Sequence, residues 1–355
     1  MDKLYIAGIG MITSLGENTS TTTAAVNAGI SRYAVSNYYG DNSDPITMAN
    51  IPDAALAEIE AELDEGDVFC ERHYRVTLMA IDSVREACST LNSKEVIPLF
   101  VAMPDVDEDT DGLVPMVNEL EENCQPRIST SKSRSIYTGR AAGIEAIDFA
   151  FRHADTTNDN YILVGGSDSY QDYDRINPLA EKNRLLEQGN MNGFVPGEAA
   201  CFLLLTSKVE LAKQHKRKVI ALHPPGIANE PGHFHSEEPY KGDGLDQAFK
   251  KALGNSSNSK INSIYSSMNG EHYWAKELGV AFTRNKSAFY DSTNTEHPAD
   301  LLGDVGSATG SLLVALAVKN LFNNSKVNKH LVYSSSDTAR RGAIILEKMS
   351  LADIN

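Results

Sequence analysis

The sequence predicts an α/β fold made of two similar halves. At 355 residues the chain is too long for one ordinary hydrophobic core. Apolar, strand-like runs alternate with helix-like segments along the chain, and strands that alternate with helices imply parallel sheets covered on both faces. A basic segment, Lys213–Lys218 (KQHKRK), separates two such series, which suggests an internal duplication. We expect one half over residues 1–207 and the other over residues 208–355.

In the first half, apolar runs predict strands at Leu4–Ile9, Val96–Met103, Tyr161–Val164 and, as a glycine-interrupted pair, Phe194–Leu205. Periodic apolar positions and polar helix starts predict helices at Ser20–Ala28, Asp53–Leu63, Glu71–Leu91 and Gly139–His153. The polar stretch from residue 36 up to the second of these helices predicts irregular structure, and Gly165–Asp168 predicts a turn. The acidic run Asp105–Gly112 indicates a solvated loop rather than a metal site.

The second half repeats the alternation. Strands are predicted at Val219–His223, Ile261–Ser267, Ala288–Tyr290, Lys329–Ser334 and Gly342–Glu347. Helices are predicted at Gly244–Leu253, Trp274–Leu278 and Gly310–Leu321.

Composition and charge exclude several classes of protein. A formal net charge of −16 argues against general binding to nucleic acid or anionic membranes, because negative potential repels phosphate. The start of the chain lacks the pattern of a signal peptide, and no window approaches a transmembrane span, so we expect a cytoplasmic protein. The four cysteines, which we expect to be free thiols without metal-type spacing, are Cys70, Cys88, Cys124 and Cys201.

Neither a cofactor nor a metal is expected. Gly8, Gly10 and Gly16 follow the first strand but do not fit the dinucleotide pattern GxGxxG, and no phosphate-binding GK[ST] is present. None of the nine histidines forms an HxxxH or HExxH pair. In the loop that holds His233 and His235, solvation is a better explanation than metal binding. The two histidines kept as weak catalytic candidates are His272 and His297.

Several motifs resemble the β-ketoacyl-ACP synthases of the thiolase superfamily. They are the opening IAGIGMITSLG, the segment Ser135–Ala150 with its following strand and Gly165-Gly166, and NGFVPGEAA at residues 192–200. The resemblance implies a five-layered αβαβα fold with mixed sheets, two helices buried between them, and a homodimer or heterodimer built through sheet edges. Gly139 and Gly143 would allow their helix to be one of the buried pair. Glu198 would be a buried structural carboxylate.

The same resemblance places other residues at the family's reactive positions. Arg140 stands where the reactive Cys begins its helix, and a guanidinium cannot attack a thioester. In Tyr265–Glu271 (YSSMNGE), Asn269 falls on the first catalytic His, with Glu271 nearby as a further carboxylate. In GDVGSATG, Asp304 falls on the second His. We expect Arg140 to pair with Asp304 or Glu271 and Asn269 to be hydrogen-bonded to that pair.

These substitutions lead to three functional hypotheses. The first is a non-condensing, chain-length-factor-like partner of an active synthase in fatty acid or polyketide-type synthesis. It implies an acyl-shaped cavity, a large apolar dimer face and a basic patch for acyl carrier protein at Lys132, Arg134 and Lys216–Lys218. The second is a scaffold or adaptor that reuses the fold without an acyl cavity. The third is an acyltransferase-type enzyme with altered chemistry, in which Arg140 holds an anionic group.

Overall fold

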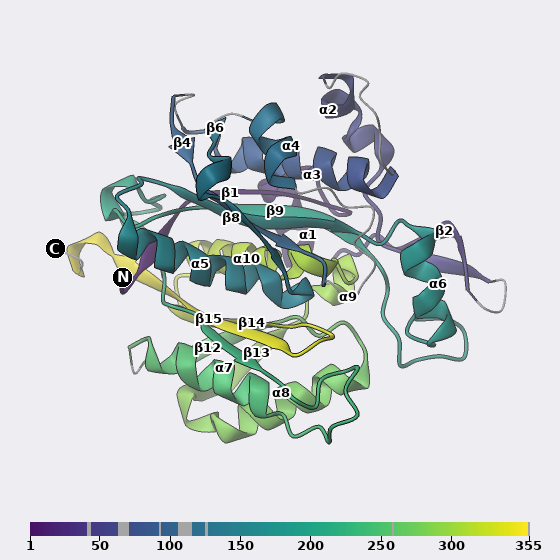
Figure 1. The fold of residues 1–355 in the computed structure, drawn as a ribbon. Coiled ribbons are helices and arrows are strands. Elements are labelled where there is room, and N and C mark those ends of the chain that lie inside the picture. Colours follow the sequence, from purple (N-terminus) through teal and green to yellow (C-terminus); the bar gives the residue numbers. More distant parts are fainter. Residues whose placement is uncertain are drawn as a thin grey trace.

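The computed structural model describes residues 1–40, 44–62, 71–91, 94–105, 116–124, 127–257 and 259–353. Layers of helix and strand alternate through the molecule (Figure 1). From one side to the other, α3 and α4 cover a first set of strands, α5 and α10 lie in the middle, and a second set of strands is covered by α7 and α8. The αβαβα arrangement predicted for the chain is therefore confirmed.

Two sets of strands with the same topology form one continuous mixed sheet. The first set runs in the order β7-β5-β8-β9-β1 and the second in the order β13-β12-β14-β15-β10. Numbered along the chain without the short β11, which pairs with β15 off this path, each set reads 3-2-4-5-1, with the fifth strand antiparallel to its neighbours. The sets meet where β1 pairs with β10, with Leu4 opposite Leu222. The boundary predicted at residues 207 and 208 falls between β9 and β10 and stays a prediction.

The strands of the large sheet are β1 (Leu4–Thr13), β5 (Leu99–Met103), β7 (Arg134–Tyr137), β8 (Ile162–Ser169), β9 (Glu198–Thr206), β10 (Lys218–Leu222), β11 (Gly226–Asn229), β12 (Ile261–Ser266), β13 (Phe289–Glu296), β14 (Lys329–Ser335) and β15 (Arg340–Ser350). The outer and connecting helices are α1 (Thr19–Asn27), α2 (Ala57–Glu62), α3 (Glu71–Ala87), α4 (Met116–Asn123), α6 (Tyr173–Glu181), α7 (Asp243–Gly254), α8 (His272–Arg284) and α9 (Ala299–Leu302).

The two central helices, α5 (Ala142–Thr156) and α10 (Thr309–Asn323), begin in the same way. Each follows a short 3₁₀ turn that opens on a glycine with positive φ, 61° at Gly139 and 53° at Gly306. The helices then cross at Gly143 and Gly310. A Cβ on Gly143 would lie 2.7 Å from the backbone nitrogen of Ser311, so only glycine permits this approach. The prediction that the Gly139–Gly143 helix is buried between the strand layers is confirmed.

Several local predictions are wrong. The stretch predicted to be irregular contains a hairpin of β2 (Ala34–Tyr39) and β3 (Pro45–Met48). The predicted turn Gly165–Asp168 lies inside β8, where glycine allows the neighbouring β9 to pass closely. The predicted pair Phe194–Leu205 contains one long strand, because residues 194–197 make only isolated bridges. The strand predicted from residue 96 divides at Pro98, which separates β4 (Val96–Ile97) from β5. Most of the acidic loop, together with Leu63 and Cys70, lies outside the described residues.

Candidate functional site

The structure brings together side chains from both halves where the two central helices begin. Arg140 lies in the turn before α5, Asp304 precedes the turn before α10, and Asn269 and Glu271 follow β12. All four side chains are buried. Helix starts that cross at glycine contacts place these distant segments side by side, which is why the cluster forms.

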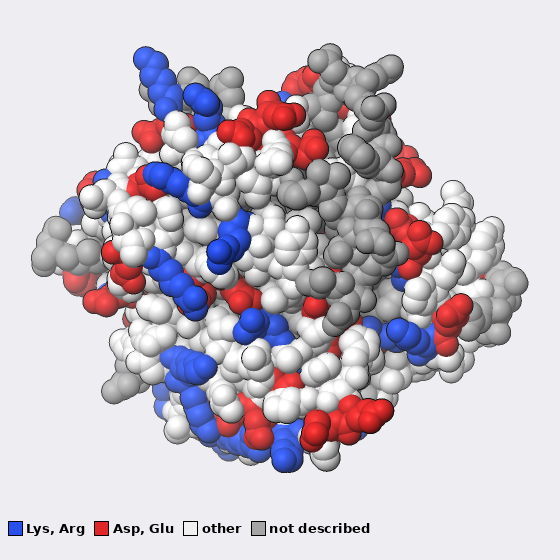
Figure 2. Space-filling model, viewed as in Figure 1, with Lys and Arg blue, Asp and Glu red and all other residues white. Residues whose placement is uncertain are grey.

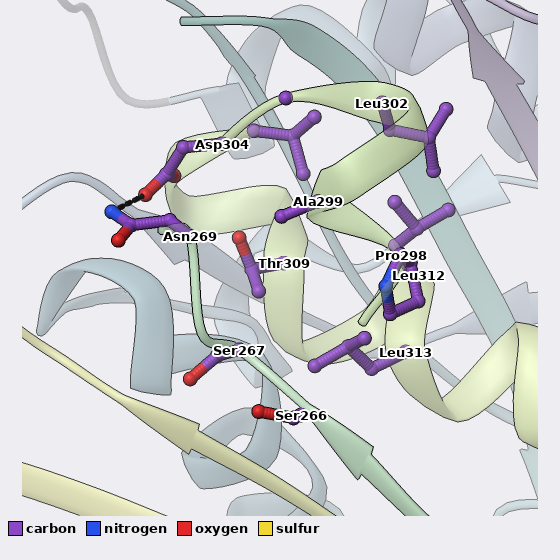
Figure 3. Close-up of a pocket in the computed structure, with 12 residues that line it drawn as sticks. Ser266, Ser267, Asn269, Pro298, Ala299, Leu302, Asp304, Thr309, Leu312 and Leu313 are labelled. Carbon is purple, nitrogen blue, oxygen red and sulfur yellow. Dashed lines mark hydrogen bonds between the residues drawn. The ribbon is translucent and has the colours of Figure 1, made fainter. Parts of the chain in front are cut away.

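The predicted ion pair is present. Arg140 Nη1 lies 3.1 Å from Asp304 Oδ2. Asn269 donates its amide to the same oxygen over 2.8 Å, as Figure 3 shows. Glu271 accepts a second, 3.1 Å bond from Asn269 but is not the ion-pair partner of Arg140. It pairs instead with Arg184, over 2.8 Å at each of its two oxygens.

Asp337 is a member of this cluster that the sequence reasoning missed. One of its oxygens lies 2.7 Å from Arg140 Nη2 and the other 2.5 Å from Arg184 Nη1. The side chains thus form a chain of alternating charges from Asp304 to Glu271. Trp274 covers it: its ring centre lies 4.1 Å from the Arg140 guanidinium, and its indole nitrogen donates to Glu271 over 3.0 Å. The available signal was that Asp337 is the one carboxylate in the segment SSSDTA.

Electrostatics keep Arg140 and Asp337 charged. Burial alone would lower the pKa of Arg140, but Asp304 and Asp337 raise it above its ordinary value. Burial would likewise raise the pKa of Asp337, and the two arginines hold it well below the usual range of a carboxyl group. Asn269 does not exchange a proton near neutral pH. Arg140, Asp337 and Asn269 therefore hold fixed charge or fixed hydrogen bonds and do not transfer protons at neutral pH.

Another buried carboxylate, that of Asp168, lies beside this cluster. Asp168 Oδ1 lies 2.8 Å from Arg72 Nη2 and 2.9 Å from Arg175 Nη1, and the Asp168 side chain is 1% exposed. Burial would raise the pKa of Asp168, and the two arginines lower it. The backbone N–H of Ser307, next to Gly306, donates to it over 2.8 Å. Asp168 therefore ties β8 to the turn that begins the second central helix.

Glu198 is fully buried, as predicted. It accepts hydrogen bonds from Arg75, the backbone of Ile51, Ser169 and Gln171. These bonds occupy both carboxylate oxygens, which fits a structural role rather than acid–base chemistry.

The space around Arg140 is small. The cavity of Figure 3, beside Asn269 and Asp304, has a volume of about 20 Å³. A second one, lined by Arg140, Tyr170 and Asp337, holds about 10 Å³. Such volumes suit single water molecules. An acyl-shaped cavity at Arg140 is therefore not found among the residues that the structure describes, whereas an open pocket of about 450 Å³ lies beyond Tyr170 and Asp337.

The remaining candidate residues lie elsewhere. His272 is exposed at the start of α8, and His297 is half-buried just before α9. His233 and His235 line the open pocket. Within the described ranges, no group of three or more His, Cys, Asp or Glu side chains could hold a metal ion.

The described cysteines are buried and free. Burial raises the pKa of the Cys88 and Cys124 thiols to about 12 and that of Cys201 further, so all three are protonated at neutral pH. They are poor nucleophiles in this state.

Two basic side chains of the predicted carrier-protein patch lie beside acidic or aromatic groups. Lys132 pairs with Asp159 at 2.8 Å, and the Arg134 guanidinium lies 5.0 Å from the ring centre of Phe149. Figure 2 shows basic and acidic side chains interspersed over the visible face. The carrier-protein patch and the apolar dimer face stay predictions. Among the described helices, none is long and apolar enough to cross a membrane.

Comparison by sequence finds no matching family model and no matching curated protein. Solved structures do match. The ishigamide ketosynthase/chain length factor aligns with a TM-score of 0.77 at 15% identity, covering 97% of this chain and 98% of its own. The ketosynthase ApeO in complex with its chain length factor ApeC from Xenorhabdus doucetiae aligns with a TM-score of 0.69 at 15% identity over 97% and 98%. The AntDE:AntF complex of a type II polyketide acyl carrier protein with its ketosynthase aligns with a TM-score of 0.73 at 16% identity, covering 97% of this chain and 98% of its own.

These alignments extend over nearly the whole chain. The chain therefore has the thiolase-type fold of the ketosynthases and chain length factors.

Proposed function

We propose that this protein is a non-condensing, chain-length-factor-like partner of an active ketosynthase. The observation that carries the proposal is Arg140 at the start of the first central helix, where the resemblance places the nucleophilic cysteine. Its guanidinium is engaged on both sides by Asp304 and Asp337. A buried, doubly paired cation cannot form an acyl-enzyme.

The other substitutions support the same reading. Asn269 and Asp304 stand where the resemblance places two catalytic histidines, and neither side chain is an imidazole that could relay a proton near neutral pH. The shared hydrogen bond between them makes the pair part of a polar plug. A plug of this kind stabilises the junction of the two halves without reacting.

The proposed partner is the condensing subunit, joined through the edge of the sheet. β7 is one end of the strand order, and no other strand of the described residues pairs with its outer side, which is where a strand of another chain could add. The ketosynthase–chain length factor pair and the carrier-protein complex among the similar structures support a synthase subunit or an acyl carrier protein as partner. Work in fatty acid or polyketide-type synthesis and a cytoplasmic location are parts of the same proposal.

A scaffold or adaptor role is the second candidate, and one observation favours it. The cavities beside Arg140 hold only about 20 and 10 Å³, so the part of the chain that the structure describes leaves no room for an acyl group there. An adaptor needs no such room. Identification of the proteins that co-purify with the native chain separates the two: a condensing subunit supports the partner role, and a stable complex without one supports the adaptor role.

Catalytic inactivity is tested with acyl-ACP and acyl-CoA. We expect no thioester adduct by intact-protein mass spectrometry and no condensation with malonyl-ACP, with an active ketosynthase as the positive control. Arg140→Cys should not restore condensation, because Asn269 and Asp304 still lack imidazole groups. Turnover-dependent acylation of the unmodified chain, or condensation by the variant at the rate of the active enzyme, would contradict the proposal.

A further inference from the structure

The open pocket ends against the buried charge cluster. Its volume of about 450 Å³ is within the range of small-molecule sites. Tyr170 and Asp337 line this pocket and also line the small cavity beside Arg140. These two side chains therefore form the wall between the surface pocket and the interior.

Asp337 occupies a position built to hold a carboxylate. Its Oδ1 accepts a hydrogen bond from Arg140 Nη2 over 2.7 Å, and its Oδ2 accepts one from Arg184 Nη1 over 2.5 Å. Two guanidinium groups that converge on one carboxylate are an arrangement by which proteins bind carboxylates strongly and with defined geometry. Asp337 belongs to the short connection between β14 and β15, so a turn supplies this carboxylate.

Both arginines are also held by groups other than Asp337. Arg140 keeps Asp304 at 3.1 Å and the ring of Trp274 at 4.1 Å. Arg184 keeps two hydrogen bonds to Glu271, and its guanidinium lies 4.2 Å from the ring centre of Phe234. Loss of the Asp337 carboxylate would leave two oriented cations at the inner end of an open pocket.

We infer that the open pocket is a binding site for a small organic carboxylate and that the chain's own Asp337 occupies its anion position. Pro178 and Leu179 from α6 supply apolar lining for the body of such a ligand. Lys182 and the two histidines of the lining add cationic or hydrogen-bonding groups, against the single further carboxylate of Asp174. This site does not depend on the partner role proposed above.

Asp337 acts in this arrangement as an internal competitor. A carboxylate ligand reaches the two arginines only in molecules whose turn has moved, and its apparent affinity falls by the fraction of such molecules. If one molecule in ten or fewer is open, removal of the internal carboxylate increases affinity by about tenfold or more.

The test is Asp337→Ala, titrated with sodium acetate by calorimetry and by thermal unfolding. We expect acetate to bind the variant at least about tenfold more tightly than the unmodified chain and to raise its melting temperature. Sodium chloride and acetamide at the same concentrations should not raise the melting temperature of the variant. Asp246→Ala is the control, because the buried Asp246 also lies between two cations, Lys250 and Arg284, and none of these three residues is part of the lining of the open pocket. It should gain no affinity for acetate.

Asp337→Asn keeps the inference testable if the alanine variant does not fold. The amide preserves shape but gives up the charge, so acetate should displace it more readily than it displaces the carboxylate. Recovery of folded Asp337→Ala only in the presence of acetate supports the site. The inference is overturned if neither variant binds acetate more tightly than the unmodified chain, or if the Asp246→Ala control gains as much. In the Asp337→Ala background, Arg184→Met should remove the gain, and its persistence would likewise contradict the site.

Discussion

Replacement of Arg140 by methionine measures the cost of leaving its two buried carboxylates without this cation. Methionine has a similar length but no charge, so the variant leaves Asp304 buried without a cationic partner and Asp337 with Arg184 alone. Removal of one member of a buried ion pair typically costs about 3–5 kcal/mol, because the remaining charge is uncompensated. We expect a loss of about 3–5 kcal/mol in the free energy of unfolding, which includes the lost contact with Trp274.

Arg152→Met is the control for this measurement. The Arg152 side chain is 68% exposed and pairs with Asp148 four residues earlier on the same helix. Exposed pairs of this kind contribute up to about 1 kcal/mol. The two variants remove the same chemical group, one from α5 and one from the 3₁₀ turn before it, so the difference in their stability loss reports burial and pairing.

Urea unfolding provides the assay, with two probes. Trp274 is the one tryptophan of the sequence and contacts Arg140, so its fluorescence follows the cluster, while far-ultraviolet circular dichroism follows the whole chain. In the double variant Arg140→Met with Asp304→Asn, part of the loss should be recovered, because the uncompensated carboxylate is gone. A loss for Arg140→Met no larger than that for Arg152→Met would refute this reasoning.

Two further predictions concern packing and pH. Gly143→Ala should destabilise the fold by about 1–3 kcal/mol in urea, because its Cβ would lie 2.7 Å from the Ser311 backbone nitrogen, whereas Gly254→Ala, with nothing within 4 Å, should be close to neutral. Burial raises the pKa of Asp82 from 3.8 to about 6, so ionisation is less favourable in the folded chain, and this residue's contribution to stability falls as the pH rises through that range. Asp82→Asn should therefore be more stable than the unmodified chain by about 1–2 kcal/mol at pH 8 and should show no gain near pH 4. Thermal melting at the two pH values measures this difference. An equal gain in stability at the two pH values would contradict the raised pKa of Asp82.

Most of the secondary structure could be predicted from local patterns. The long amphipathic run that forms α3 and the apolar run that forms β14 lie close to their predicted bounds. The β2–β3 hairpin could not be found in this way, because all six side chains of β2 are exposed or half-buried and carry no apolar periodicity. Gly165–Asp168 has the composition of a turn, but pairing with β9 on one side and β5 on the other keeps it extended.

The residues of the candidate site were likewise predicted only in part. Motif resemblance was enough to predict that Arg140, Asn269 and Asp304 would meet, because these residues lie in segments with recognisable neighbours. Arg184 and Asp337 were missed, since each lies in a connection without helical or strand periodicity, and their ion pair joins positions 153 residues apart.

The sequence by itself determined the alternation of strands and helices and the glycines that admit a helix crossing, and the resemblance of its motifs placed an arginine where a nucleophile was expected. These are properties of residue type and short-range spacing. Only the tertiary structure decided that Asp337 completes the chain of charges and that Glu271 pairs with Arg184 instead of Arg140. It also decided that two side chains, Tyr170 and Asp337, separate an open pocket from a nearly filled interior. Such pairings depend on which connections meet after the two halves pack, and sequence separation carries no information about that distance.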